Sequence, residues 1–405
     1  MNFAFIACEY NPFHNGHLYH ITKTRESGAD AIICIMSGNF VQRGDVAIAE
    51  KHSRAKIALM NGADLVLELP LKYAVAPAQL FADGFIKTAA ATGLDGFISF
   101  GAKDDLCDLI KLVDCMFSDN AENFAALQVK NGFNYAKAKS MFVEKELGEY
   151  FSNILNDANN MLALEYLRSA RAHFPTVGIK SITRKNVMHN SILPDGNFAS
   201  ASYIRKLLYD SYDNSLNDFL HSIKRFIPDN EYNYLLNEYS SGRFPSDRNR
   251  FEIATVSRLF TLTLEEIAVI NNVNEGLENR IFNAIKNNVV LSEMLDDVKS
   301  KRFTHSRIRQ IFMNAILGIN RNDIEAGLSY IRVLGFNSKG RQCLHQMKST
   351  SKIPVIANLS EIDKNNESAA RDAYLDYEAG KLFSLLLPSA NIKNPEYEIP
   401  PVCLL

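Results

Sequence analysis

Cysteine is scarce in this sequence, with six residues in 405, and no two of them form a C-x-x-C pair. That spacing excludes a disulfide framework and a zinc-finger site. No apolar run reaches the length of about 18 residues that a transmembrane helix needs, and the chain opens on a strand-like segment instead of a secretory leader. We therefore expect a cytoplasmic protein without a membrane partner.

An excess of charge of one sign is also lacking. The chain has 44 Lys and Arg residues against 46 Asp and Glu residues, a formal net charge of −2. Nothing global attracts it to nucleic acid or to an acidic membrane, so any contact with RNA must be local. Hydrophobic residues make up 47% and charged residues 22% of the chain, which is typical of a globular protein of two or three domains. No protein partner is implied.

Short apolar segments alternate with helical patterns over the first hundred residues. We expect strands at Phe3–Cys8, Ala31–Met36, Leu65–Leu69 and Gly96–Phe100, with helices between them. Near-continuous apolar strands that alternate with amphipathic helices are typical of a parallel sheet covered on both faces. The sequence therefore predicts an α/β fold with a Rossmann-like, doubly wound parallel sheet.

The rest of the chain has a different character. Residues 104–174 have a mostly helical pattern, and a strand at 177–182 is expected to return to the sheet. Beyond about residue 215, Asn-rich turns separate further helices. Residues from 331 onward suggest a small α/β tail after this mainly helical part. The predicted domains are residues 1–215, 216–330 and 331–405.

The strongest motif follows the first strand and opens the next helix, and it runs Glu9-Tyr10-Asn11-Pro12-Phe13-His14-Asn15-Gly16-His17. It lies at the carboxyl edge of the predicted sheet, where such folds bind ligands, and a helix N-terminus suits phosphate. His14 and His17 share one face of the first turn, where their N–H groups can stabilise charge that develops at an α-phosphorus. Gly16 lets the backbone approach the nucleotide closely. The alternative is a helix start with surface histidines.

Two other polar segments are candidates for phosphate binding. Ser200 and Ser202 offer hydroxyls at a helix start, and Arg205 offers a fork for β- and γ-phosphates, unless they are an ordinary cap and a solvated arginine. A loop after the second strand supplies a further candidate set for phosphate or a substrate carboxylate: Ser37, Gly38, Asn39, Gln42 and Arg43. The alternative is a loop kept for its turn chemistry. The sequence contains no recognisable set of metal ligands, and we expect Mg²⁺ to be carried by the phosphates of ATP.

These segments resemble the bacterial tRNA(Met) cytidine acetate ligases, which are His-x-Gly-His nucleotidyltransferase-like proteins. The matching segments span nearly the whole chain: 9–20, 36–44, 63–70, 100–101, 159–160, 199–205, 301–304, 306–309 and 333–340. The resemblance implies ATP-dependent activation of acetate to acetyl-adenylate with release of pyrophosphate. The acetyl group then passes to N4 of the wobble cytidine, position 34, of elongator tRNA(Met), which forms N4-acetylcytidine.

The motifs and the resemblance together indicate which residues act. The expected catalytic residues are His14, His17 and Arg205. The expected ATP-binding residues are Ala7, Cys8, Glu9, Tyr10, Asn11, Pro12, Phe13, His14, Asn15, Gly16, His17, Leu18, Tyr19, His20, Gly101, Asn159, Asn160, Arg184, Ser200 and Ser202. The first domain is then the catalytic one, and the helical domain binds tRNA.

A local basic stripe in the helical domain is the candidate for tRNA binding. Its cations are Lys299, Lys301, Arg302, Arg307 and Arg309, with Phe303 among them and no acid in the eleven residues 299–309. Cations with an aromatic residue suit phosphate contacts and base stacking. The alternative is a solvated helix face.

Other functions share the His-x-Gly-His core. A simple adenylyltransferase would join AMP to a phosphorylated cofactor precursor, but about 190 residues after the core would stay unexplained. An aminoacyl-tRNA synthetase would need a lysine-rich signature loop in place of the Ser-Ala-Ser-x-x-Arg element. A non-catalytic RNA-binding protein with a relic nucleotide site would not need the intact histidines. Acetate-dependent ATP–pyrophosphate exchange separates these alternatives.

Overall fold

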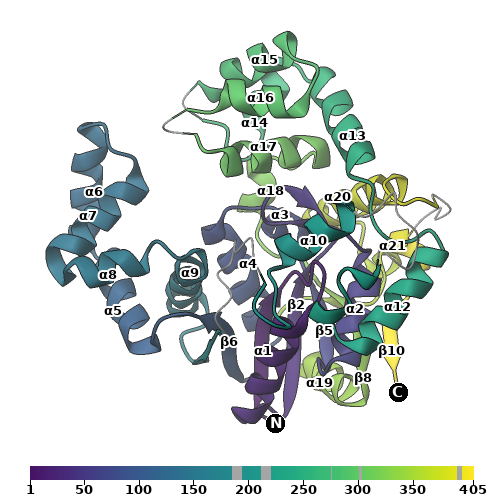
Figure 1. The fold of residues 1–405 in the computed structure, drawn as a ribbon. Coiled ribbons are helices and arrows are strands. Elements are labelled where there is room, and N and C mark those ends of the chain that lie inside the picture. Colours follow the sequence, from purple (N-terminus) through teal and green to yellow (C-terminus); the bar gives the residue numbers. More distant parts are fainter. Residues whose placement is uncertain (185–193, 211–219, 275, 301–302, 390–394) are drawn as a thin grey trace.

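The computed structural model describes residues 1–184, 194–210, 220–274, 276–300, 303–389 and 395–405. Its centre is one sheet in the order β10-β8-β5-β2-β1-β6-β7, with β9 paired to β8 (Figure 1). Neighbouring strands in this sheet run parallel, except that β5 and β8 are antiparallel. The strands are β1 (Phe3–Cys8), β2 (Ala31–Ser37), β5 (Leu65–Leu69), β6 (Gly96–Ala102), β7 (Gly178–Thr183), β8 (Ile331–Asn337), β9 (Val355–Ile356) and β10 (Val402–Leu404).

The doubly wound prediction is confirmed by five of these strands. From β1 the chain moves outward to β2 and β5, and then crosses to β6 and β7 on the other side of β1. The direction of winding therefore reverses between β1 and β6. In open α/β sheets, ligands bind at the carboxyl ends of the strands beside this switch point. The predicted return strand is β7, which pairs with β6 along its whole length.

Alternate residues of β1 explain why the sheet is covered on both faces. Phe3 and Phe5 pack into a core with α4 (Ala78–Ala91), α9 (Ala158–His173) and α19 (Ser338–Thr350). Ala4 and Ile6 face the opposite core, to which α1 (Asn15–Glu26), α2 (Lys51–Met60), α10 (Ala201–Asp210) and α12 (Asp229–Ser240) contribute. All four strand residues are buried, as expected for a central parallel strand.

Two groups of helices extend from this body. One is an arm of α5 (Leu106–Met116), α6 (Asp119–Lys130), α7 (Tyr135–Leu147) and α8 (Glu149–Ile154), on the left in Figure 1. The other, at the top, has its own apolar core and consists of α13 (Arg248–Phe260), α14 (Leu264–Val269), α15 (Leu277–Asn287), α16 (Leu291–Val298) and α17 (His305–Leu317). The predicted boundary at residue 215 lies outside the described residues. Across the described ranges, no helix is both long and apolar enough to cross a bilayer.

The C-terminal segment joins the main sheet instead of forming a sheet of its own. Strand β8 pairs antiparallel with β5, and β10 pairs with β8, so residues 331–404 finish the edge that the N-terminal strands leave open. The helix α20 (Glu367–Leu385) also packs with the hairpin of β3 (Phe40–Val41) and β4 (Asp45–Val46) in one apolar cluster. The sequence predicts an α/β segment here but not the pairing of β8 with β5, because pairing between distant segments depends on tertiary packing.

Candidate active site

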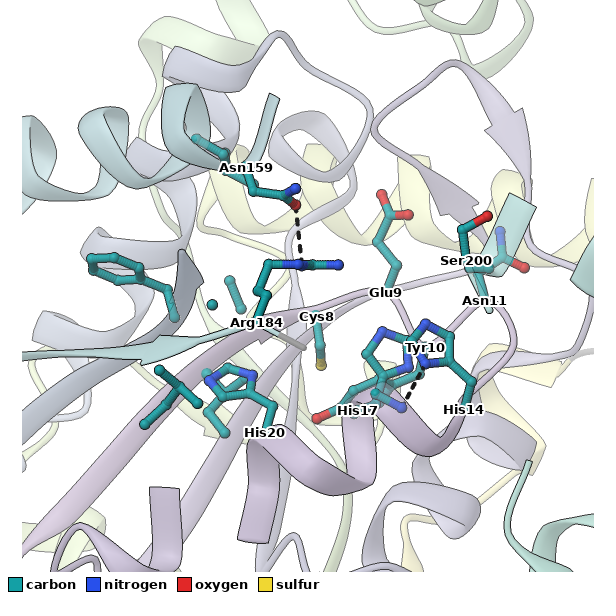
Figure 2. A pocket seen from close by; sticks show the side chains of 18 of the residues that line it. Cys8, Glu9, Tyr10, Asn11, His14, His17, His20, Asn159, Arg184 and Ser200 are labelled. Carbon is teal, nitrogen blue, oxygen red and sulfur yellow. Dashed lines mark hydrogen bonds between the residues drawn. The ribbon is translucent and has the colours of Figure 1, made fainter. Parts of the chain in front are cut away.

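A cavity of about 260 Å³ lies at the switch point, beside the carboxyl ends of β1, β6 and β7 (Figure 2). It is enclosed by the start of α1, by the turn of the β3–β4 hairpin and by the segment that enters α10. Many of the predicted ligand residues line it: Ala7, Cys8, Glu9, Tyr10, Asn11, His14, Gly16, His17, Tyr19, His20, Gln42, Arg43, Gly101, Asn159, Arg184 and Ser200.

The two histidines of the motif stack on each other at the start of α1. Their ring centroids are 3.6 Å apart with an interplanar angle of 21°. His14 is the N-cap of α1, and its Nδ1 accepts a hydrogen bond of 3.0 Å from the amide of Gly16. A neutral His14 ring therefore carries its proton on Nε2. The face of His17 is fixed by Tyr10, whose ring centroid lies 4.9 Å away.

Burial and neighbouring charges favour the neutral forms of His17 and His20. Burial, together with the nearby His14 and Arg184, holds the pKa of His17 well below the usual 6.5. Burial and then Arg184 lower the pKa of His20 to about 4, and its Nε2 lies 3.0 Å from the hydroxyl oxygen of Ser99. Nδ1 of His17 is buried and has no hydrogen-bond partner among the described residues. Such a nitrogen is a candidate contact for a ligand, because unsatisfied buried polar atoms are costly.

Arg184 and Asn159 form the opposite side of the cavity (Figure 2). Arg184 Nη1 donates to Asn159 Oδ1 at 3.1 Å, and Asn159 is held by Asp157, the N-cap of α9. A Cβ atom on Gly101 would lie 3.2 Å from Cγ of Arg184, so the glycine leaves room for the arginine. A guanidinium, an amide and imidazole N–H groups thus face one space. They offer hydrogen-bond donors to phosphate oxygens.

Arg205 and Ser202 lie next to this cavity without lining it. Arg205 Nη1 donates to the carbonyl oxygen of Asn11 at 2.6 Å, and Nη2 lies 3.4 Å from the hydroxyl oxygen of Ser202. Both residues line a neighbouring cavity, and Arg43 lines the two. The structure therefore brings the Ser-Ala-Ser-x-x-Arg element against the histidine motif.

Several residues predicted to bind a ligand do not line this cavity. Besides Arg205 and Ser202, they are Pro12, Phe13, Asn15, Leu18, Ser37, Gly38, Asn39 and Asn160. Phe13 is fully buried in the core, and Asn15 donates to the carbonyl oxygens of Asn197 and Arg225. Asn160 is also fully buried and donates to Asp104 at 2.7 Å. A residue's place in a sequence motif therefore does not show whether it lines the cavity or supports the surrounding backbone.

The structure shows a further role for Gly16, next to the His14 ring. A Cβ atom at this position would lie 2.8 Å from Cε1 of the His14 ring. Because that ring caps the helix, the glycine leaves space for the His14 side chain. Ser37, Gly38 and Asn39 are likewise held in place from within the protein, since Asn39 Oδ1 accepts from the amide of Lys51 at 2.8 Å.

Sequence reasoning missed one organising residue, Arg54 of α2. Its guanidinium is 1% exposed and donates to the carbonyl oxygens of Glu9 at 2.5 Å, Ser37 at 3.0 Å and Gly38. It thereby ties the end of β1 to the loop after β2. The apolar wall formed by Phe81, Phe100, Leu162 and Tyr166 was missed as well. No local signal marks these residues, because each belongs to an ordinary helix or strand pattern.

Three of the five cations in the predicted basic stripe belong to the described residues, and their surroundings differ. Lys301 and Arg302 lie outside the described residues. Arg307 donates to the carbonyl oxygen of Asn272 and to Oδ1 of Asn274, while Lys299 and Arg309 are exposed. Phe303 is only 8% exposed and packs in the helical core, so the expected base stacking on this ring is wrong.

Comparison with known proteins identifies the family of the chain. The family model described as HIGH Nucleotidyl Transferase matches residues 1–398. A tRNA(Met) cytidine acetate ligase of Thermoanaerobacter sp. (strain X514) is 35% identical over 98% of each chain. Crystal structures of Thermotoga maritima TmcAL, one apo and one bound with alpha-thio ATP, are 30% identical, cover both chains fully and have TM-scores of 0.92 and 0.90. The chain therefore belongs to the tRNA(Met) cytidine acetate ligase family of HIGH nucleotidyl transferases.

Proposed function

We propose that the protein activates acetate with ATP and transfers the acetyl group to N4 of the wobble cytidine, position 34, of elongator tRNA(Met). A carboxylate oxygen of acetate attacks the α-phosphorus of ATP, which gives acetyl-adenylate and releases pyrophosphate. N4 of cytosine then attacks the acetyl carbonyl carbon, AMP leaves, and N4 loses one proton. Activation comes first because the cytosine amino group is a poor nucleophile.

The observation that carries this proposal is the stacked pair of His14 and His17 at the switch-point cavity. In our proposal both rings donate N–H groups toward the α-phosphate, where negative charge develops. Arg184 and Asn159 hold the nucleotide from the other side, and Arg43 and Arg205 are placed for the β- and γ-phosphates. Support comes from the similar Thermotoga maritima structure, which is bound with alpha-thio ATP.

Neutral histidines suit this chemistry. A lowered pKa favours the neutral form of His17, whose single N–H can donate to a phosphate oxygen. Glu9 is the one carboxylate among the described lining residues. That arrangement fits Mg²⁺ held mainly by phosphate oxygens and water, and Glu9 would contact the ion directly or through water.

The residues proposed to bind tRNA lie in the helical domain, residues 216–330. They are Lys299, Lys301, Arg302, Arg307 and Arg309. The proposed catalytic domain is residues 1–215. All six cysteines are free thiols, as is usual in the reducing cytoplasm, and we propose that the protein acts there. Arg307 is the least available of the described cations, because it is already bonded to Asn272 and Asn274.

The test is ATP–pyrophosphate exchange with purified protein, with and without acetate. We expect exchange only when acetate is present, and acetylation of a tRNA(Met) transcript only when both are present. Exchange that ignores acetate but responds to a phosphorylated cofactor precursor would assign the simple adenylyltransferase. A protein that binds RNA but exchanges no pyrophosphate with any acid would match the relic-site alternative.

A further inference from the structure

A second cavity, of about 550 Å³, lies between the catalytic body and the helical unit. Its walls are the turn of the β3–β4 hairpin, α10, α13 and α17, together with three residues of α16. Five cations line it: Arg43, Arg205, Lys206, Arg248 and Arg309. Three carboxylates also line it: Asp45, Asp210 and Glu252. This lining is therefore cationic although the whole chain has a net charge of −2.

Three of these cations have no carboxylate partner among the described residues. Lys206, Arg248 and Arg309 are exposed, and none of them makes an ion pair with a residue that the structure describes. Some exposed cations elsewhere do have carboxylate partners: Lys23 lies 2.5 Å from Glu26, and Lys381 lies 3.3 Å from Glu378. Like charges gathered without partners are unfavourable in the free protein, so this arrangement favours binding of an anion.

The two cavities meet at the turn of the hairpin. Arg43 lines both of them, and the turn is pressed against α17, because Gln310 Nε2 donates to the carbonyl oxygen of Gln42 at 2.7 Å. On the other side, Arg205 of the second cavity bonds to the carbonyl oxygen of Asn11 in the first. Because Arg43 lines both cavities, a ligand in the second cavity would lie next to the proposed nucleotide site.

We infer that the second cavity holds the phosphodiester backbone of the RNA acceptor next to its reacting nucleotide, with Lys206, Arg248 and Arg309 as phosphate contacts. This assignment rests on the proposed function. A volume of this size is ordinary for a nucleotide-sized ligand, since ligand pockets span about 300–1,000 Å³. The triphosphate of ATP is a second source of phosphate. It would be met by Arg43 and Arg205, however, whereas Arg248 and Arg309 lie on the helical unit and line only the second cavity.

The test compares two triple variants. K206A/R248A/R309A removes three of the cations that line the cavity. R341A/K348A/K352A is the matched control, because it removes three exposed cations on or just after α19, at the opposite end of the molecule (Figure 1). Binding of a tRNA(Met) transcript is measured without ATP or acetate at several salt concentrations. Acetate-dependent pyrophosphate exchange and the thermal midpoint are measured on the same preparations.

We expect the cavity variant to bind the transcript roughly 10- to 100-fold more weakly at 0.1 M salt, and its log–log salt slope to fall by about two to three, because each phosphate contact contributes about 0.7–0.9. Pyrophosphate exchange and its KM for ATP should match the parent. RNA affinity equal to that of the control would overturn the assignment. A raised KM for ATP with unchanged RNA affinity would assign these cations to the triphosphate instead. If the parent lacks acetate-dependent exchange, the proposed function fails, while the RNA measurement still decides the cavity.

Discussion

At the scale of single residues, the site depends on how one imidazole is oriented. His14 both caps α1 and stacks on His17, so one hydrogen bond from the Gly16 amide fixes its tautomer and its direction. Preorganised donors are effective because they need no rearrangement when charge develops in the transition state. The same contact explains why residue 16 is a glycine.

His14→Ala and His17→Ala should each lower the rate of acetate-dependent exchange by about 10²–10³-fold, as is typical when one charge-stabilising donor is lost. The thermal midpoint should change far less than the rate. His345→Ala is the control, because this histidine is exposed on α19. Near-parental turnover in both site variants would mean that the histidines only shape the helix start.

Gly16→Ala should lower the exchange rate without removing any functional group. The added Cβ would lie 2.8 Å from the His14 ring and must displace it from its capping position. Gly28→Ala provides the control, since nothing lies within 4 Å of a Cβ there. The comparison of the two rates measures the importance of ring position, and an unaffected Gly16→Ala enzyme would contradict it.

The lowered pKa of His20 predicts acid sensitivity. The unfolded chain binds a proton at this residue below pH 6.5, whereas the folded protein does so only near pH 4. Stability from this group is therefore fully present above pH 6.5 and decreases as the pH falls, by about 3 kcal/mol at pH 4. Chemical unfolding of the parent and of His20→Gln at pH 7, 6 and 5 checks this. The variant should show the shallower pH dependence, and equal slopes would exclude His20 as the cause.

At the scale of elements, the β3–β4 hairpin connects the nucleotide site to the helical unit. Gly44 in its turn has φ +68, and a Cβ atom there would lie 2.6 Å from the backbone carbonyl carbon of Arg309. The turn and α17 are therefore in backbone contact. The hairpin strands also bury Phe40 and Val46 against α20 and α17.

Gly44→Ala should lower stability by about 2 kcal/mol or more, because it combines a left-handed backbone with a steric clash. Gly28→Ala has a positive φ as well but open surroundings, and should cost only about 1 kcal/mol. Thermal unfolding of both variants gives the comparison. If the two midpoints agree, then α17 moves away at little cost and the contact is loose.

The sequence was most informative about elements and least informative about their partners. Apolar periodicity located β1, β2, β5 and β6, and the position of the histidine motif after β1 located the cavity. Residues such as Arg54, which acts through three distant carbonyl groups, leave no local pattern. The same limit explains why Phe303 was expected to be a stacking ring, since burial depends on packing and not on its basic neighbours.

At the scale of the whole molecule, buried charges attach the end of the chain to the sheet. Glu396 of α21 (Pro395–Glu398) bonds to Lys51 of α2 at 2.7 Å and to Arg332 of β8, and Lys51 also lies 2.9 Å from Glu68 of β5. All four side chains are buried. Two cations and two carboxylates thus balance within the core.

Glu396→Ala should lower the free energy of unfolding by about 3–5 kcal/mol, because it leaves two buried cations with one carboxylate. Glu398→Ala, two residues further on and exposed, should be close to neutral. Urea unfolding of both variants measures the difference. A small effect of Glu396→Ala would show that water replaces the lost carboxylate.

The antiparallel pairing of β5 with β8 has a consequence for how the protein is made. While the ribosome synthesises the chain, the N-terminal strands emerge long before residues 331–337, so the outer side of β5 has no neighbour during most of translation. An unpaired apolar edge is a template for joining another chain. A fragment that stops at residue 215 keeps this edge open permanently, and we expect it to aggregate. We therefore expect the nascent chain to need a chaperone until residues 331–337 have been synthesised.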